Sequence, residues 1–290
     1  MNKVTDIFKQ NERTYSLELF PPKTEQGYQK LLETIGQLAT LKPDFISVTY
    51  GAGGGSRDKT LDIVDLVQKQ HHIAGVMHLT CVCNTKDEIK GIVDAIKSRG
   101  IANILALRGD PPKDNPGWQP TDENFRYSSE LAGFIRSTYG DYFSVGVAGF
   151  PEGHLLCPDR EKDAQYLKMK TDAGADFVIT QLFFNNQDYF DYVKRLRKLG
   201  VHNRVIPGVI PITDYNGTVN FCKTCGASVP KKVHDLFAPL QNDKEATLQA
   251  GIKFAIDQCR ELLDGGAPGL HFYTLNKISP VDIILKEVRR

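Results

Sequence analysis

The sequence has no long apolar segment and almost no excess of charge. No stretch of its 290 residues is both long enough and apolar enough to span a bilayer. Lys and Arg number 36 against 35 Asp and Glu, and the basic residues are spread along the chain rather than gathered in a stripe. Proteins that bind the phosphate backbone of nucleic acids usually carry such a stripe. We therefore expect neither a membrane nor a nucleic acid as a partner.

Cysteines are few, and the first residues do not read as a secretory signal. Residues 1–16 mix charged side chains with few apolar ones, which predicts a short surface helix in a protein of the cytoplasm. Six cysteines in so long a chain do not form a dense disulfide framework, so reduced thiols are expected. Cys222 and Cys225 make one CxxC motif, but zinc would need a second pair of ligands and a redox site would need a thioredoxin-like context. No metal site is expected, and the role of this pair is open.

Several catalytic motifs are also missing. The chain has neither the HExxH of zinc hydrolases nor the GxSxG of serine hydrolases. The Gly-rich segment 51–56 follows a predicted strand, but its spacing differs from the dinucleotide fingerprint and it lacks the lysine of a phosphate loop. It is a weak indication of phosphate binding.

Apolar runs of strand length alternate with amphipathic helical segments along the whole chain. This alternation is typical of repeated βα units around a parallel sheet. The predicted strands cover 16–20, 45–50, 75–81, 104–108, 143–148, 177–182, 205–209 and 270–275. Helical segments at 27–41, 59–69, 86–98, 127–138, 159–173 and 186–198 lie between them, and 216–226, 230–238 and 243–263 add helices before the last strand.

Eight such strands predict an α/β fold, a (βα)8 TIM barrel with extra helices near the last strands. The chain shows no repeat and no flexible linker, so residues 1–290 are expected to form a single catalytic domain. An open, doubly wound sheet is the alternative, although it usually has fewer strands and a clear Gly-rich first turn.

Polar side chains at the strand ends are the candidates for function, because barrel active sites lie at the carboxyl ends of the strands. In the first strand the two-residue period turns Leu17 and Leu19 toward the helices and Ser16, Glu18 and Phe20 toward the axis. Burial would raise the pKa of the Glu18 carboxyl and let it donate a proton near neutral pH. A Glu paired with an Arg inside the barrel is the alternative interpretation.

The same reasoning selects a set of polar residues that should converge on one mouth of the barrel. A lone His in a strand is often a satisfied core residue, and a Gln can simply tie loops together. Joint clustering nevertheless favours a functional site. The set comprises Thr49, His78, Thr80, Asp110, Gln181 and Tyr273.

Seven blocks, in order along the chain, resemble the methylenetetrahydrofolate reductase family. They are LELFPPKT at 17–24, SVTYG at 47–51, HLTC at 78–81, ALRGD at 106–110, ITQLFF at 179–184, IPG at 206–208 and HFYTLN at 271–276. The resemblance implies a βα barrel that binds FAD. It is to the short bacterial type, without the regulatory extension of eukaryotic members, so inhibition by S-adenosylmethionine is not expected.

The resemblance also implies the reaction. NADH or NADPH would reduce FAD and leave, and the reduced flavin would then convert 5,10-methylenetetrahydrofolate to 5-methyltetrahydrofolate, which supplies methyl groups for methionine synthesis. The protein would supply position and protons. Glu18 matches the general acid that protonates a folate nitrogen, and Asp110 matches the acidic residue beside flavin and pterin.

The remaining site residues carried over from the family are binding residues. For the folate or nicotinamide these are Gln181, Tyr215, Tyr273 and Lys277. For FAD they are Thr49, His78, Arg108, Gly109, Asp110, Tyr127, Ser128, His154, Asp163 and Lys170. An ion pair between Arg108 and Asp110 is the plain alternative to a contact of Arg108 with the pyrophosphate.

Some positions depart from the family pattern. Phe150 stands where Tyr is frequent, Tyr166 and Met169 replace polar residues on the helix near FAD, and Lys277 replaces an Arg. Two other functions are the alternatives: a flavin-free lyase or aldolase, which would need a catalytic Lys at a strand end, and a non-catalytic scaffold, which would lose the polar mouth. The family tends to form homo-oligomers, and the preference between NADH and NADPH is open.

Overall fold

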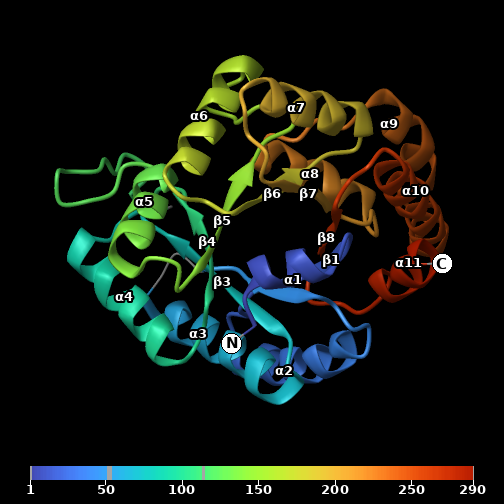
Figure 1. Cartoon of the computed structure of the whole chain (residues 1–290). Coiled ribbons are helices and arrows are strands. Elements are labelled where there is room, and N and C mark those ends of the chain that lie inside the picture. Colours follow the sequence, from blue (N-terminus) through green and yellow to red (C-terminus); the bar gives the residue numbers. More distant parts are fainter. Residues whose placement is uncertain (1, 51–53, 113–114, 290) are drawn as a thin grey trace.

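The computed structural model describes residues 2–50, 54–112 and 115–289. Eight parallel strands close into a barrel in chain order, and β8 pairs with β1 (Figure 1). They are β1 (Thr14–Leu19), β2 (Phe45–Val48), β3 (Ala74–Thr80), β4 (Asn103–Leu107), β5 (Ser144–Gly149), β6 (Phe177–Leu182), β7 (Arg204–Val209) and β8 (Gly269–Tyr273). The predicted TIM barrel is confirmed, each strand within two residues of its expected ends. The closed barrel rules out the open sheet.

Helices surround the barrel on the outside (Figure 1). They are α2 (Glu25–Ala39), α3 (Gly54–His71), α4 (Lys86–Ser98), α5 (Ser128–Tyr139), α6 (Arg160–Asp172), α7 (Asn186–Lys198) and α11 (Val281–Val288). Three further helices precede β8, as expected: α8 (Tyr215–Cys225), α9 (Lys231–Phe237) and α10 (Lys244–Asp264). The Gly-rich segment 51–56 lies largely outside the described residues.

Side-chain caps explain where several of these helices begin. Thr85 accepts a hydrogen bond from the backbone N–H of Glu88, whose carboxylate in turn accepts from the Thr85 N–H, so α4 starts with a complete capping box. Asp159 accepts from two backbone N–H groups of α6, and Asp243 from one of α10. Each cap satisfies N–H groups that the first turn of a helix leaves without a partner.

The main core lies between the strands and the surrounding helices, and it takes the outward residues of the strands. Leu17 and Leu19 of β1 are fully buried there, as the two-residue period predicts. Inside the barrel the lower layer is apolar. It consists of Val4, Phe45, Ala74, Val76, Leu105, Phe177, Ile179 and Ile206.

The amino-terminal helix α1 (Val4–Gln10) closes the barrel from below, where Figure 1 shows it crossing the centre of the ring. The Phe8 ring lies 6.4 Å from Phe45 and 5.5 Å from Phe177, centroid to centroid. Arg204 donates to the Phe8 carbonyl at 2.6 Å. The expected short helix is present, with Lys9 and Gln10 exposed, and its other face packs onto the floor of the barrel. Val4, Ile7 and Phe8, at positions i, i+3 and i+4, make up that face.

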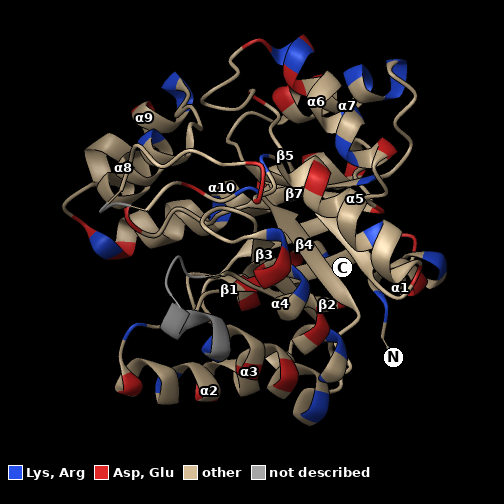
Figure 2. Cartoon of the chain, turned by 90° about the vertical axis from the view of Figure 1, so that its left-hand side faces the viewer, with Lys and Arg blue, Asp and Glu red and all other residues tan. Residues whose placement is uncertain are grey.

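Charged residues of both signs are mixed over the helices (Figure 2). Many of them pair within one helix, such as Lys168 with Asp172 and Lys231 with Asp235. Exposed pairs of this kind contribute about 0.3–0.5 kcal/mol each. Among the described residues no helix combines the length and the apolar character needed to cross a bilayer.

Candidate active site

Glu18 projects from β1 into the barrel, above the apolar layer. Its Oε2 atom lies 3.5 Å from Nε2 of His271 on β8 and 3.5 Å from Nε2 of His78 on β3. The side chain of Glu18 is 17% exposed, whereas those of the two histidines are almost fully buried. The predicted inward position is confirmed. The partners of Glu18 are two histidines rather than an Arg.

The two histidines oppose the effect of burial on Glu18. Burial pushes the pKa of the Glu18 carboxyl upward, but the hydrogen bond from His271, with the charges that His78 and His271 carry when protonated, outweighs it and lowers the pKa. The expectation of a raised pKa was thus wrong for this structure. Burial lowers the pKa of His78 to about 4, against the opposing charge of Glu18, so His78 is neutral at pH 7.

His271 connects Glu18 to Ser16 below it. Nδ1 of His271 lies 2.8 Å from the Ser16 hydroxyl, which also reaches the Leu270 carbonyl at 3.4 Å. When the hydroxyl donates to Nδ1, the Nε2–H of His271 faces a Glu18 carboxylate. When the hydroxyl turns to the carbonyl, Nδ1 donates to Ser16, and Nε2 can accept a proton from a neutral Glu18 carboxyl. Rotation of the Ser16 hydroxyl thus lets His271 form a hydrogen bond with Glu18 whether Glu18 is charged or neutral.

Two residues of β8 and its loop fix the rim of the site. Thr274 donates to the backbone carbonyl of Glu18 at 2.7 Å, and the Tyr273 hydroxyl donates to the carbonyl of Thr180 at 2.7 Å. A Cβ at Gly208 would lie 2.4 Å from that same carbonyl oxygen and 2.7 Å from the Tyr273 ring, so only glycine fits there. Burial and the nearby charges of Glu18 and Cys225 raise the pKa of Tyr273 well above its usual value. The phenol therefore stays protonated.

Further predicted residues lie around this rim. The oxygen of the Gln181 side chain accepts from the Leu182 N–H at 2.9 Å, and no described residue accepts from its amide NH₂. Thr49 follows β2, where its backbone N–H donates to the Leu19 carbonyl. Asp110 is exposed in the loop after β4. The described residues show no ion pair between Arg108 and Asp110.

A second polar cluster lies at the ends of β4 and β5, against α6. Lys170 donates to the Ala148 carbonyl at 2.9 Å, and its ammonium lies 5.5 Å from the centre of the Phe150 ring. Burial lowers the pKa of Lys170 to about 8, although Asp163 opposes this shift. Burial raises the pKa of Asp163 to about 6, against the charge of Lys170. The pKa of His154 is lowered by burial and by the charges of Lys170 and Arg108. Two cationic side chains, Lys170 and Arg108, thus lie near two carboxyl groups, Asp163 and Asp110, in this half-buried region.

Other binding residues lie farther from Glu18. Tyr127 is exposed and precedes α5, while Ser128, at its first turn, is buried. The Tyr215 ring is buried and stacks on Phe237 at 6.5 Å, and its hydroxyl lies 2.6 Å from Nδ1 of His234. The structure thus places Tyr215 in a packed cluster beside the mouth.

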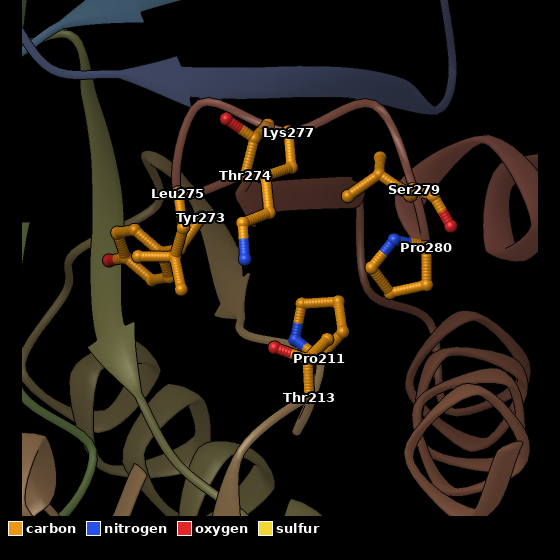
Figure 3. A pocket seen from close by; sticks show the side chains of 9 residues that line it. Pro211, Thr213, Tyr273, Thr274, Leu275, Lys277, Ser279 and Pro280 are labelled. Atoms are coloured by element: carbon orange, nitrogen blue, oxygen red, sulfur yellow. The ribbon is translucent and has the colours of Figure 1, made fainter. Parts of the chain in front are cut away.

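Lys277 lies on the β8 side of the mouth, as Figure 3 shows. It extends across a small hollow of about 10 Å³ that Tyr273, Pro211 and Pro280 also line. A space of this size holds about one water molecule. The cationic end of Lys277 thus stands at the edge of the mouth.

Sequence reasoning missed His271, Ser16 and Thr180. The signal for His271 was present, because it lies two residues before Tyr273 and must share its inward face. Ser16 was placed on the axis but given no partner. Within the described part of the chain, no group of three or more His, Cys, Asp or Glu side chains is arranged to hold a metal ion.

Comparison with known proteins identifies the family. The family model described as methylenetetrahydrofolate reductase matches residues 3–289. The chain belongs to this family. "5,10-methylenetetrahydrofolate reductase" of Salmonella typhimurium is 34% identical over 268 residues, covering 92% of this chain and 88% of that protein.

Longer relatives of the methylenetetrahydrofolate reductase family match over part of their length. "Methylenetetrahydrofolate reductase (NADH) 1" of Arabidopsis thaliana is 36% identical over 285 residues, which is 95% of this chain and 48% of that protein. "Probable methylenetetrahydrofolate reductase (NADPH)" of Caenorhabditis elegans is 34% identical over 99% of this chain and 44% of its own. The chain thus spans about half the length of these relatives.

Solved structures share the barrel at low sequence identity. A Clostridium thermocellum protein that "binds two copies of 5-methyl-5,6,7,8-tetrahydrofolic acid" superposes with a TM-score of 0.66 at 14% identity, over 98% of this chain and 96% of its own. Dihydropteroate synthase of Xanthomonas albilineans has a TM-score of 0.53 at 12% identity, over 94% of this chain and 91% of its own. At such identities the likeness is one of fold.

Proposed function

We propose that this chain reduces 5,10-methylenetetrahydrofolate to 5-methyltetrahydrofolate with electrons from NADH or NADPH, by a ping-pong reaction through FAD. The product would supply methyl groups for methionine synthesis. The observation that carries the proposal is Glu18, a carboxyl inside the barrel mouth with His78 and His271 as its partners, in a chain of the methylenetetrahydrofolate reductase family. A cytoplasmic, homo-oligomeric enzyme with one catalytic domain belongs to the same proposal.

The cluster at β4 and β5 suits the diphosphate of FAD. Arg108 and Lys170 supply positive charge near His154, and Arg108 makes no ion pair with a described residue that would compete for it. Gly109 has a positive φ of 81°, and a Cβ there would lie 2.6 Å from Val82, so the loop is tightly packed at this point. When bound, FAD would supply the hydride transfer between the nicotinamide and the folate.

The other assigned residues complete the proposed cofactor site. Thr49 and His78 would contact FAD from β2 and β3, and Tyr127 and Ser128 from the start of α5. His154, Asp163 and Asp110 would provide hydrogen-bonding partners near the cationic groups. Buried His78 Nε2 has no hydrogen bond within the described residues, although Glu18 is close to it, so its bonding capacity is unused.

Glu18 would act as the proton donor in folate reduction. In this structure its lowered pKa favours the carboxylate. A ligand that covers its exposed edge would remove the remaining water and raise the pKa, because burial disfavours the charged form. With neutral His78 on one side and His271 able to accept on the other, the mouth then holds a neutral carboxyl. The proton would pass from the carboxyl to the folate nitrogen, leaving the carboxylate beside His271.

The folate itself would be oriented by groups around the rim. The unpaired amide NH₂ of Gln181 would donate to the pterin, and Asp110 would accept from it. Lys277 would meet the negatively charged tail. Tyr273 would serve as a rigid wall, since its hydroxyl is already engaged with Thr180.

The visible absorption spectrum of the purified protein tests the proposal. We expect a yellow protein that is bleached anaerobically by NADH or NADPH and regains its colour when 5,10-methylenetetrahydrofolate is added. Each change reports one half-reaction. A colourless protein that neither binds added FAD nor consumes nicotinamide would overturn the proposal.

The variant Glu18→Gln tests the role of the carboxyl. We expect normal flavin content and normal reduction by the nicotinamide, but a folate half-reaction slowed by about 10²–10⁴, the usual contribution of a general acid. Glu33→Gln, an exposed residue of α2, is the matched control and should leave both half-reactions unchanged. Normal folate turnover in Glu18→Gln would refute the proton-donor role.

A further inference from the structure

The CxxC motif lies at the carboxyl end of α8, outside the site described above. Cys222 is fully buried, and Cys225 is half-buried, one turn later on the same face. The Cys225 thiol donates to the backbone carbonyl of Cys222 at 3.7 Å, so the sulfur of Cys225 lies back along the helix toward its partner. Both cysteines are free thiols.

The helix end is held against the loop that follows β5. Gly226, in the left-handed region with a φ of 78°, ends α8, and a Cβ there would touch Leu155. The Glu152 carboxylate accepts from the Ser228 N–H at 3.1 Å. Glu152 and, from β8, Tyr273 are near enough to interact electrostatically with Cys225. The pair thus lies between the β5 loop and the barrel mouth.

The two thiols differ strongly in their acidity. The hydrogen bond from the Cys222 thiol lowers the pKa of Cys225 to about 7; burial and the charge of Glu152 oppose this, and the Ala227 N–H assists it. The same hydrogen bond, together with burial, raises the pKa of Cys222. The negative end of the helix dipole disfavours a thiolate at this position, so the Cys222 thiol and the backbone N–H groups of Ala227 and Cys225 are what stabilise it. The half-buried Cys225 is therefore the more nucleophilic thiol, and the fully buried Cys222 stays protonated.

We propose that Cys222 and Cys225 form a reversible dithiol–disulfide site that reacts with low-molecular-weight disulfides, with Cys225 as the attacking residue and Cys222 as the resolving residue. The Cys225 thiolate attacks one sulfur of the small disulfide, and the first small thiolate leaves. Cys222 then loses its proton and attacks the Cys225 sulfur of the mixed disulfide, and the second small thiolate leaves. Two protein thiols are oxidised, and one small disulfide is reduced to two thiols.

The position of the pair in the helix determines how stable the bond is. Side chains three residues apart in a helix have Cβ atoms about 5–6 Å apart, whereas a disulfide needs about 3.5–4.5 Å. The Cβ atoms of Cys222 and Cys225 must therefore approach each other by about 1–2 Å. Because Cys225 is the last residue of α8 and Gly226 follows, only the helix end has to move. A bond under such strain is readily reduced, so the site is reversible rather than structural.

The other cysteines lack this arrangement. Cys81 and Cys259 are buried, and burial raises the pKa of both, to about 11 for Cys81. Cys83 is exposed and Cys157 is half-buried, so both are accessible to the same reagents. They must be removed before the CxxC pair is tested.

The experiment uses the full chain carrying Cys83→Ser and Cys157→Ser, incubated with excess glutathione disulfide at pH 7.5. Intact mass and peptide mapping should find a bond between Cys222 and Cys225 that dithiothreitol reverses. Adding Cys222→Ser should trap one glutathione on Cys225, and adding Cys225→Ser should abolish modification of the pair. The absence of a Cys222–Cys225 bond in the parent protein, or equal modification in the Cys225→Ser protein, would overturn the proposal.

A second measurement stays informative if one of these variants folds poorly. The rate of alkylation of Cys225 by iodoacetamide, followed by peptide mapping in the parent protein, should rise with pH about a midpoint near 7. Cys222→Ala removes the thiol donor and should move the midpoint upward, with folding checked by circular dichroism. A midpoint in the parent protein near the 8.5 of an ordinary thiol would overturn the assignment of Cys225 as the attacking residue. Both tests measure thiol chemistry alone, so they stand apart from the proposed reductase activity.

Discussion

The affinity of the protein for FAD should fall as the pH rises from 7 to 9, because Lys170 loses its charge in this range. Its pKa is lowered to about 8, so about nine tenths of the side chain is charged at pH 7 and about one tenth at pH 9. If only the ammonium form binds the diphosphate, affinity falls by about tenfold across this window. Lys170→Met should weaken binding at pH 7 by about 10-fold to 150-fold, the value of a hydrogen bond to a charged group of about 1.5–3 kcal/mol.

The assay is titration of apoprotein with FAD, followed by flavin fluorescence, at several pH values between 7 and 9. Lys170→Arg is the matched control, since a guanidinium stays charged throughout this range and its affinity should not change with pH. The pKa of Asp163, about 6, lies below the window. An affinity that is constant with pH in the unmodified protein, or that falls equally in Lys170→Arg, would refute the reasoning.

Two further predictions concern packing and the Glu18 carboxyl. Gly208→Ala places a Cβ 2.7 Å from the Tyr273 ring and should lower the free energy of unfolding by about 1–3 kcal/mol in urea denaturation. The control Gly36→Ala, in an open helical position, should raise the free energy of unfolding by about 0.5–1 kcal/mol. Equal effects of the two substitutions would contradict the packing argument. His271→Phe removes the group whose hydrogen bond lowers the pKa of Glu18, so that pKa should rise. The infrared carbonyl band of the protonated carboxyl should then persist to higher pH, and a band unchanged from the unmodified protein would count against this account.

The strand pattern sufficed to predict the barrel, because side-chain alternation and helical periodicity are local properties of the sequence. Glu18 shows what such local patterns can and cannot predict. Its inward position follows from its neighbours Leu17 and Leu19, but the direction of its pKa shift depends on His271, 253 residues away. An argument about the pKa of Glu18 that uses β1 alone includes the effect of burial but omits the histidines on the other strands. That omission reversed the expected direction.

The helix α1 and Tyr215 show the same limit. Val4, Ile7 and Phe8 mark one apolar face of this seven-residue helix, but no local pattern says that the face meets Phe45 and Phe177. The stacking of Tyr215 on Phe237 likewise joins two of the helices inserted before β8. Such contacts depend on how segments dock in space, which no local period encodes.

The helix α1 and the apolar layer close the barrel beneath Glu18, so that, as far as the described residues show, its interior opens at the carboxyl ends of the strands. The only polar relay leading down from Glu18 within the described residues, through His271 and Ser16, stops at a backbone carbonyl. Protons and reactants must therefore enter and leave through the same mouth, and a ligand bound there blocks that path. Because the pKa of the free Glu18 carboxyl is lowered, Glu18 must gain its proton through the mouth while the ligand enters, and it can pass on only that proton before the ligand leaves.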